Sequence, residues 1–219
     1  MYGNLTVMSF HLSIRKFAEE PITRQLITGI LKEYKRPNDK IHELIKEGIL
    51  IPVKRGLYVP GPKLDILQPE PFLLANHIYG PSYVSLESAL SYWGLIPEKV
   101  YETSSVTIRS SKIFRTEIGR YSYHYLGLPY YAFGIQRVML TPKQAALVAS
   151  PEKALCDKII TTSNINLRSK KQVLDFLLED LRIEEGSLLN FDLSMMESWI
   201  EDAPKKNSLK LLVKTLQGL

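Results

Sequence analysis

The chain has 219 residues, of which 45% are hydrophobic and 23% charged, and its net charge is +5. This composition is that of an ordinary globular protein, and the modest positive charge permits a nucleic-acid partner without requiring one. A single cysteine, Cys156, excludes an internal disulfide. No apolar run approaches the roughly 18 residues of a membrane span, and the first residues lack a signal-peptide pattern. We therefore expect a cytoplasmic protein.

The excess positive charge lies in the first segment of the chain. Residues 1–62 hold ten Lys or Arg against six Asp or Glu, whereas the remainder holds eighteen against seventeen. The stretch "PGPKLDILQPEP" at 60–71 contains four prolines in twelve residues and cannot form a helix interior or a central strand. We interpret it as a linker, which predicts a first domain over 1–62 and a second over 63–219.

The first segment has the pattern of three helices and a hairpin. "LSIRKFAEE" can form a short helix, and the apolar spacing of "ITRQLITGILKEY" predicts a second, capped by Thr23. Pro37 opens a third helix, which ends at Gly48. Two β-like runs, "ILIPV" and "LYVP", follow and are joined by "KRG". This order predicts a winged helix-turn-helix; a small helical domain with an incidental hairpin is the alternative.

The placement of charge favours DNA as the partner of this segment. Basic residues stand at the start of the third helix, the end that a recognition helix inserts into the major groove, and at the hairpin tip. Asp39 and Glu43 on the same helix would repel phosphate. They either accept from a cytosine amino group or form surface ion pairs with Lys35, Arg36 or Lys46. The candidate DNA-binding residues are Lys35, Arg36, Asn38, His42, Lys46, Lys54 and Arg55.

The second segment has the pattern of an α+β domain. "EPFLLANHIY" and "SLESALSYWGL" are helical in pattern, and Ser85 is a candidate cap for the latter. Residues 100–149 then contain five short runs rich in β-branched or aromatic residues, separated by Gly, Pro or Ser. After Pro151, with Ser150 as cap, the pattern is helical to the end. Helices before and after a block of strands predict an α+β fold with a helical C-terminus.

Three blocks of the sequence resemble the AbiEi family of antitoxin-type transcriptional regulators. They are "PNDKIHELIKEGILIPVKRGLYVPG", "PSYVSLESALSYWGLIPEKV" and "ASPEKALCDKI". The resemblance covers about residues 20 to 160. It implies a winged helix joined to a larger antitoxin domain, within a type IV toxin–antitoxin system of the kind linked to phage defence. It also implies repression of the protein's own operon, at double-stranded DNA with inverted repeats, and antagonism of a nucleotidyltransferase-type toxin.

The strands of the second segment carry basic residues among tyrosines, a mixture that can bind RNA or an acidic protein face. The alternative is that the tyrosines pack on helices while the arginines point to water. The candidate partner surface comprises Arg109, Arg115, Arg120, Tyr123 and Arg137. The C-terminal lysines 206, 210 and 214 are typical of a solvated helix face.

Catalytic patterns are weak. The four histidines have no metal-ligand spacing, and no phosphate-binding glycine loop or nucleophile elbow occurs. "GSLLNFDLS" lacks the second carboxylate of a nucleotidyltransferase metal pair, and "SPEKALCDK" fits a helix start better than a nuclease site. We therefore expect no enzyme, no cofactor and no metal. The competing functions are a regulator whose second domain senses a ligand or partner without any toxin, and, less favoured, a nuclease.

Overall fold

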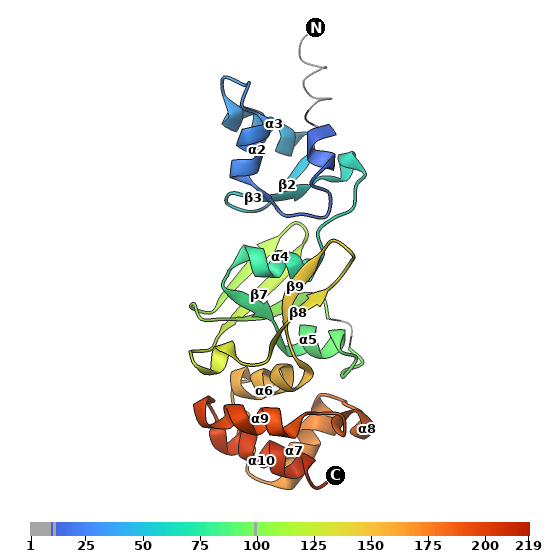
Figure 1. Cartoon of the computed structure of the whole chain (residues 1–219), viewed down its shortest axis with the longest axis vertical. Coiled ribbons are helices and arrows are strands. Elements are labelled where there is room, and N and C mark those ends of the chain that lie inside the picture. The colour runs from blue at the N-terminus through green and yellow to red at the C-terminus, as the bar shows by residue number, and fades with distance from the viewer. Residues whose placement is uncertain (1–9, 11, 99) are drawn as a thin grey trace.

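The computed structural model describes residues 10, 12–98 and 100–219, and its fold is α+β. Figure 1 shows three parts arranged along one long axis. A winged helix-turn-helix lies at one end, a six-stranded sheet with its helices lies in the middle, and a group of helices forms the C-terminal end.

The winged helix has the predicted helices and hairpin, but its first helix is shorter than predicted and the strand β1 was not predicted. Residues 12–15 are helical, and the other elements are β1 (Ile22–Thr23), α2 (Arg24–Ile30), α3 (Pro37–Lys46), β2 (Leu50–Lys54) and β3 (Leu57–Pro60). The strands form an antiparallel sheet in the order β1-β3-β2. The Thr23 side chain accepts from the Leu26 amide at 3.2 Å, which confirms the predicted cap. Pro37 lies in the first turn of α3, and Gly48 takes a φ of 70° just after it, where an L side chain would be strained.

The sheet domain follows a short η1 turn (Pro62–Leu64) and an extended segment. Its elements are α4 (Pro71–Ile78), β4 (Ser82–Val84), α5 (Leu86–Tyr92), β5 (Glu102–Thr107), β6 (Lys112–Thr116), β7 (Gly119–Tyr125), η2 (Tyr130–Ala132), β8 (Ile135–Met139) and β9 (Ala145–Ala149). The strand order is β6-β7-β5-β4-β9-β8, with β5 parallel to β7 and β4 parallel to β9. All five predicted strand regions form strands, whereas β4 was not predicted.

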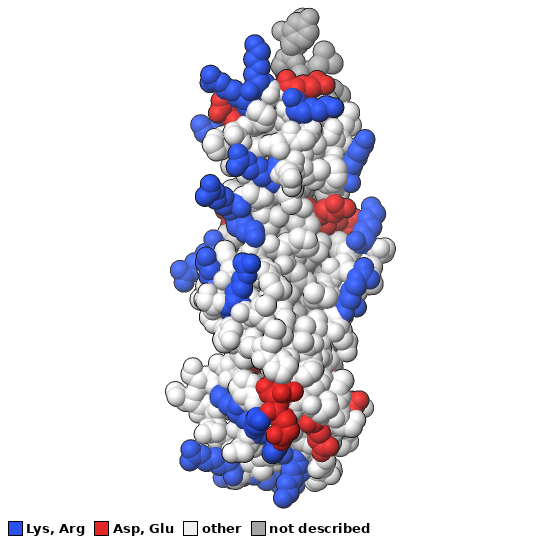
Figure 2. Space-filling view, turned by 60° about the vertical axis from the view of Figure 1, so that its left-hand side comes forward, with Lys and Arg blue, Asp and Glu red and all other residues white. Residues whose placement is uncertain are grey.

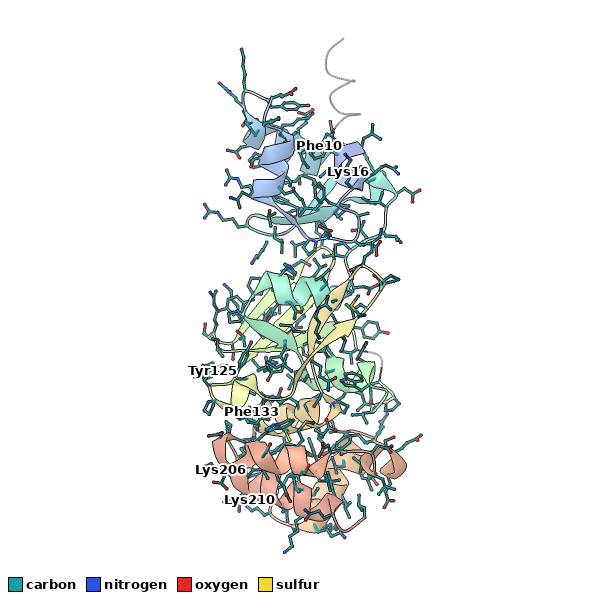
Figure 3. All side chains as sticks on the ribbon, viewed as in Figure 1. Phe10, Lys16, Tyr125, Phe133, Lys206 and Lys210 are labelled. Atoms are coloured by element: carbon teal, nitrogen blue, oxygen red, sulfur yellow. The ribbon has the colours of Figure 1, made fainter. Side chains whose placement is uncertain are left out.

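The C-terminal part is helical, as predicted. It contains α6 (Pro151–Thr161), α7 (Lys170–Leu174), the π-helical η3 (Asp175–Asp180), α8 (Glu185–Leu188), α9 (Leu193–Trp199), η4 (Ile200–Asp202) and α10 (Lys206–Leu216). Phe133, which precedes β8, stacks on Trp199 at a centroid distance of 6.4 Å and joins this part to the sheet domain (Figure 3). Lys206 and Lys210 lie on the outside of α10 and pair with Glu201.

The two faces of the central sheet pack against different helices. On one face, the Tyr123 hydroxyl donates to the Ala75 carbonyl of α4 at 2.6 Å. On the other face, the Tyr83 hydroxyl donates to Asp157 of α6 at 2.9 Å. Since side chains alternate along a strand, β7 presents Tyr121 and Tyr123 to the α4 side.

A buried polar cluster connects the sheet to α6. The side chains of Lys153 and Asp157 are both 0% exposed, and Lys153 Nζ lies 3.1 Å from Asp157 Oδ1. Asp157 Oδ2 accepts from Tyr83 at 2.9 Å and from Ser85 at 2.8 Å. Lys153 Nζ also donates to the Tyr130 carbonyl at 2.9 Å. Each charge is therefore compensated by an ion pair and by hydrogen bonds, as burial requires.

Two predicted helix caps have different outcomes. Ser150 accepts from the Lys153 amide at 3.2 Å and caps α6, which confirms that prediction. Ser85 precedes α5 but makes no side-chain capping bond, so its predicted cap is wrong. The hydroxyl donates instead to the buried carboxylate of Asp157, because an uncompensated charge there costs more than an open helix end.

The Asp157 carboxylate should be essential for stability. We expect Asp157→Ala to lower the free energy of unfolding by about 3–5 kcal/mol, because it leaves the Lys153 ammonium buried without its counter-charge. Urea denaturation measures the change, and Asp180→Ala, at an exposed aspartate, is the matched control. Equal effects of the two substitutions would contradict a structural role for the cluster.

Candidate nucleic-acid interface

A groove of about 410 Å³ lies between α3 and the wing, which comprises β2, β3 and the turn at 55–56. Asn38 and His42 line it from α3, and Arg55 lines it from the tip of the wing. Arg24, the first residue of α2, also lines the groove and donates from Nη2 to Asn38 Oδ1 at 2.7 Å. The structure thus brings predicted residues of the helix and the wing to one surface.

The groove is basic. Arg24, Lys54 and Arg55 line it, and no Asp or Glu among the described residues does so. A concave surface with one sign of charge concentrates counter-charged groups such as phosphates. The remaining predicted DNA-binding residues lie at the two ends of α3. Lys35 and Arg36 are exposed just before its start, and Lys46 is exposed at its last residue.

The acidic residues of α3 are engaged in ion pairs. Asp39 lies 3.8 Å from Arg36, one of the partners expected for it, and both side chains are largely exposed. Glu43 pairs at 2.7 Å with Lys40, which is not one of the partners expected for it. Lys40 is buried beside Tyr34, with its Nζ 6.0 Å from the ring centroid. Asp39 therefore follows the ion-pair alternative, whereas Glu43 pairs with a cation other than those predicted, and both pairs reduce the repulsion of phosphate.

Lys54 and Arg55 are neighbours in sequence but have different environments. Lys54 Nζ donates to the carbonyls of His77 and Ile78, at 3.0 and 2.6 Å, and so caps the C-terminus of α4. Desolvation and the positive charge of Arg109 lower the pKa of Lys54. Arg55 is exposed and makes no hydrogen bond or ion pair with the described residues. Lys54 thus joins the wing to the sheet domain, and Arg55 is open to solvent.

The five residues predicted as a second surface do not form one patch. Arg137 lies on β8, while Arg115 lies on β6 at the opposite edge of the sheet. Arg120 pairs with Glu102 at 2.5 Å. Tyr123 is 1% exposed and packs on α4, so it cannot contact a partner at the surface. That assignment is corrected, because the alternation of β7 directs its tyrosines inward at this position.

Basic residues of the sheet domain nevertheless continue the surface of the wing. The Arg109 guanidinium lies 5.5 Å and Lys112 Nζ 5.8 Å from the centroid of Tyr79, which directly follows α4. Arg109 also acts electrostatically on Lys54. Figure 2 shows Lys and Arg side chains recurring along its left-hand side, from the winged helix at the top onto the sheet domain. The basic surface therefore extends beyond the winged helix.

Sequence reasoning missed Arg24 as a groove residue. The sequence predicts that Arg24 starts a capped helix, but it does not predict the contact with Asn38, because that contact depends on how α2 packs against α3.

No cluster of three or more His, Cys, Asp or Glu side chains that could hold a metal ion occurs among the residues that the structure describes. Within the same residues, no helix combines the length and apolar character needed to cross a bilayer.

The fold and the groove define a winged-helix protein with an α+β body. No family model matches the chain, and no curated protein matches it. Among solved structures, the chain is similar to the crystal structure of the RV2827C protein from Mycobacterium tuberculosis. The TM-score is 0.64 at 13% sequence identity, over 97% of this chain and 77% of that chain. This likeness concerns the fold alone, so the resemblance to AbiEi rests on the three sequence blocks.

Because Lys54 caps α4 and Arg55 is exposed, substitutions at these two positions should differ in their effect on stability. We expect Lys54→Ala to lower the free energy of unfolding by about 1–2 kcal/mol, because two carbonyls at the end of α4 lose a charged donor. Arg55→Ala, one residue away, is the control and should leave the thermal midpoint unchanged. Calorimetry measures both variants, and a Lys54→Ala protein as stable as the wild type would show that the cap contributes nothing.

Proposed function

We propose that the protein is a cytoplasmic DNA-binding autoregulator and antitoxin, which represses its own operon and counteracts a nucleotidyltransferase-type toxin. The observation that carries the DNA-binding part is the basic groove between α3 and the wing, on a winged helix-turn-helix scaffold. The antitoxin part rests on the AbiEi resemblance.

The geometry suggests a role for each group in the groove. The start of α3, with its unpaired amides and the exposed Arg36, approaches the major groove of DNA. Asn38 and His42 follow on the groove side of α3, where they can reach base edges. Arg55 neutralises a phosphate. Lys54 acts differently from the expectation, since it holds the wing against α4 and only indirectly positions Arg55.

The blocks that carry the family resemblance meet in space. Tyr83 and Ser85 belong to the second block, Lys153 and Asp157 belong to the third, and the four side chains form the buried polar cluster. The co-occurrence of these blocks therefore has a structural reason in this chain. The cluster supports a second domain built like that of the AbiEi family. Toxin antagonism is tested by the growth-rescue experiment below.

Salt dependence tests the contact between the wing and DNA. We expect Arg55→Ala to weaken binding to the DNA upstream of the gene and to random DNA alike, and to reduce the salt slope by about 1. Lys214→Ala removes the same charge from an exposed position on α10 and should change neither quantity. Titrations of labelled DNA at several salt concentrations give both. An unchanged slope in Arg55→Ala would remove the wing tip from the interface.

Repression and toxin antagonism should be separable in the full-length protein. We expect the double variant Arg36→Ala, Arg55→Ala to lose operator binding while it still rescues growth of cells that express the cognate toxin. Both side chains are exposed, so the fold should be retained. Loss of rescue by a folded double variant would show that the winged helix takes part in neutralisation. If the wild type binds its operator but gives no rescue, the toxin-free, ligand-sensing regulator is the better description.

A further inference from the structure

A second concave site lies in the sheet domain, on the face of β5 and β7 opposite to α4. This trough has a volume of about 510 Å³, within the roughly 300–1,000 Å³ typical of small-molecule sites. Glu102 and Ser104 of β5 and Ser122 and His124 of β7 form its floor. Glu87 from α5 and Lys158 from α6 form its walls. None of these residues lines the groove between α3 and the wing.

The hydroxyl of Ser122 makes no hydrogen bond with the residues that the structure describes. Ser122 is 5% exposed and lines the trough. Its strand partner Ser104 is fully engaged by comparison, since its Oγ donates to the Ser85 carbonyl at 2.8 Å. The Ser122 Oγ stays accessible from the trough, since it is not among the fully enclosed unpaired atoms. It is therefore available to bond a ligand group that enters the trough.

His124 stands two residues further along the same face. Its imidazole also makes no hydrogen bond with the described residues. Burial lowers the pKa of its imidazole, Glu87 and Glu102 oppose this shift, and Lys158 adds to it. The ring is therefore neutral at physiological pH and offers one donor and one acceptor. Tyr125, labelled in Figure 3, is the next residue and points to the other face by the alternation of the strand.

The charged residues of the trough are already neutralised. Glu87 pairs with Lys158, and Glu102 pairs with Arg120 at 2.5 Å. A phosphate would meet two carboxylates, and a strongly cationic ligand would gain little from acids that have partners. Hydroxyl groups fit better, because each can donate to a carboxylate oxygen and accept from a lysine, serine or imidazole donor.

We propose that the trough binds an uncharged ligand through a pair of adjacent hydroxyl groups, which contact Glu87 and Glu102 on one side and Ser122 and His124 on the other. This chemistry can come from a free sugar or from the ribose of a nucleoside. The site is independent of the proposed DNA binding and antagonism of a toxin, so either can fail without the other.

The test uses the full-length, ¹⁵N-labelled protein. Glucose, ribose, adenosine, cytidine and uridine are added separately at millimolar concentrations while backbone amide shifts are recorded. We expect saturable shifts centred on residues of β5, β7 and the end of α6 with at least one of these ligands. Binding by sugars alone or by nucleosides alone identifies the source of the diol. For a nucleoside, 2′,3′-dideoxyadenosine, which lacks both hydroxyls, should give no shifts.

Two serine variants separate a binding role from a structural one. Ser122→Ala should raise the dissociation constant about tenfold, through loss of one hydrogen bond in a buried site. Ser105→Ala is the matched control: Ser105 is also buried, its hydroxyl also has no partner, and it lies on the neighbouring strand with its side chain on the opposite face. It should leave the dissociation constant unchanged. Absence of shifts with every ligand, equal binding of the dideoxynucleoside, or equal losses in both variants would overturn the proposal.

Discussion

The buried carboxylate of Asp157 is the constraint on which the second half of the molecule depends. It receives hydroxyl donors from Tyr83 and Ser85 and the ammonium of Lys153, so the end of β4, the start of α5 and helix α6 meet at one residue. These groups must be in place together, because removing one partner leaves a charge or donor without compensation far from water. The same contacts hold Glu87 and Lys158 across from each other.

The winged helix is fastened to the sheet domain by chemistry of a different kind. Val53, Leu57 and Val59 of the wing are buried in the same apolar cluster as the sheet domain, while the first helices have a cluster of their own. Lys54 adds the cap on α4, and at the other side Glu19 accepts from Thr141 and Gln144 of the β8–β9 turn, each at 3.2 Å. The proline-rich linker is therefore not the only connection between the two parts, and these contacts fix the orientation of the wing relative to the sheet domain.

Local chemistry explains what could be predicted from the sequence. Thr23 and Ser150 each accept a hydrogen bond from an amide three residues away. The sequence pattern that predicts such a cap therefore lies within one turn of helix. The failures involve distant partners. Ser85 donates to a carboxylate 72 residues away, and Lys54 caps a helix more than 20 residues further along the chain. The candidate surface failed for a related reason, since only the strand order shows that Arg137 lies at the other edge of the sheet.

Strand β7 separates the two candidate sites and determines whether they can communicate. Its Tyr123 side chain packs on α4, whose last carbonyls hold Lys54 of the wing, whereas Ser122 and His124 face the trough. Two binding sites are energetically coupled when an element between them has two discrete arrangements that both sites favour differently. Tyr123 is 1% exposed and its hydroxyl is bonded to the Ala75 carbonyl, so a shift of β7 against α4 would break a buried hydrogen bond inside a close-packed core. The packing of β7 therefore favours two sites that act independently, so we expect the proposed DNA binding to be unaffected by a ligand in the trough.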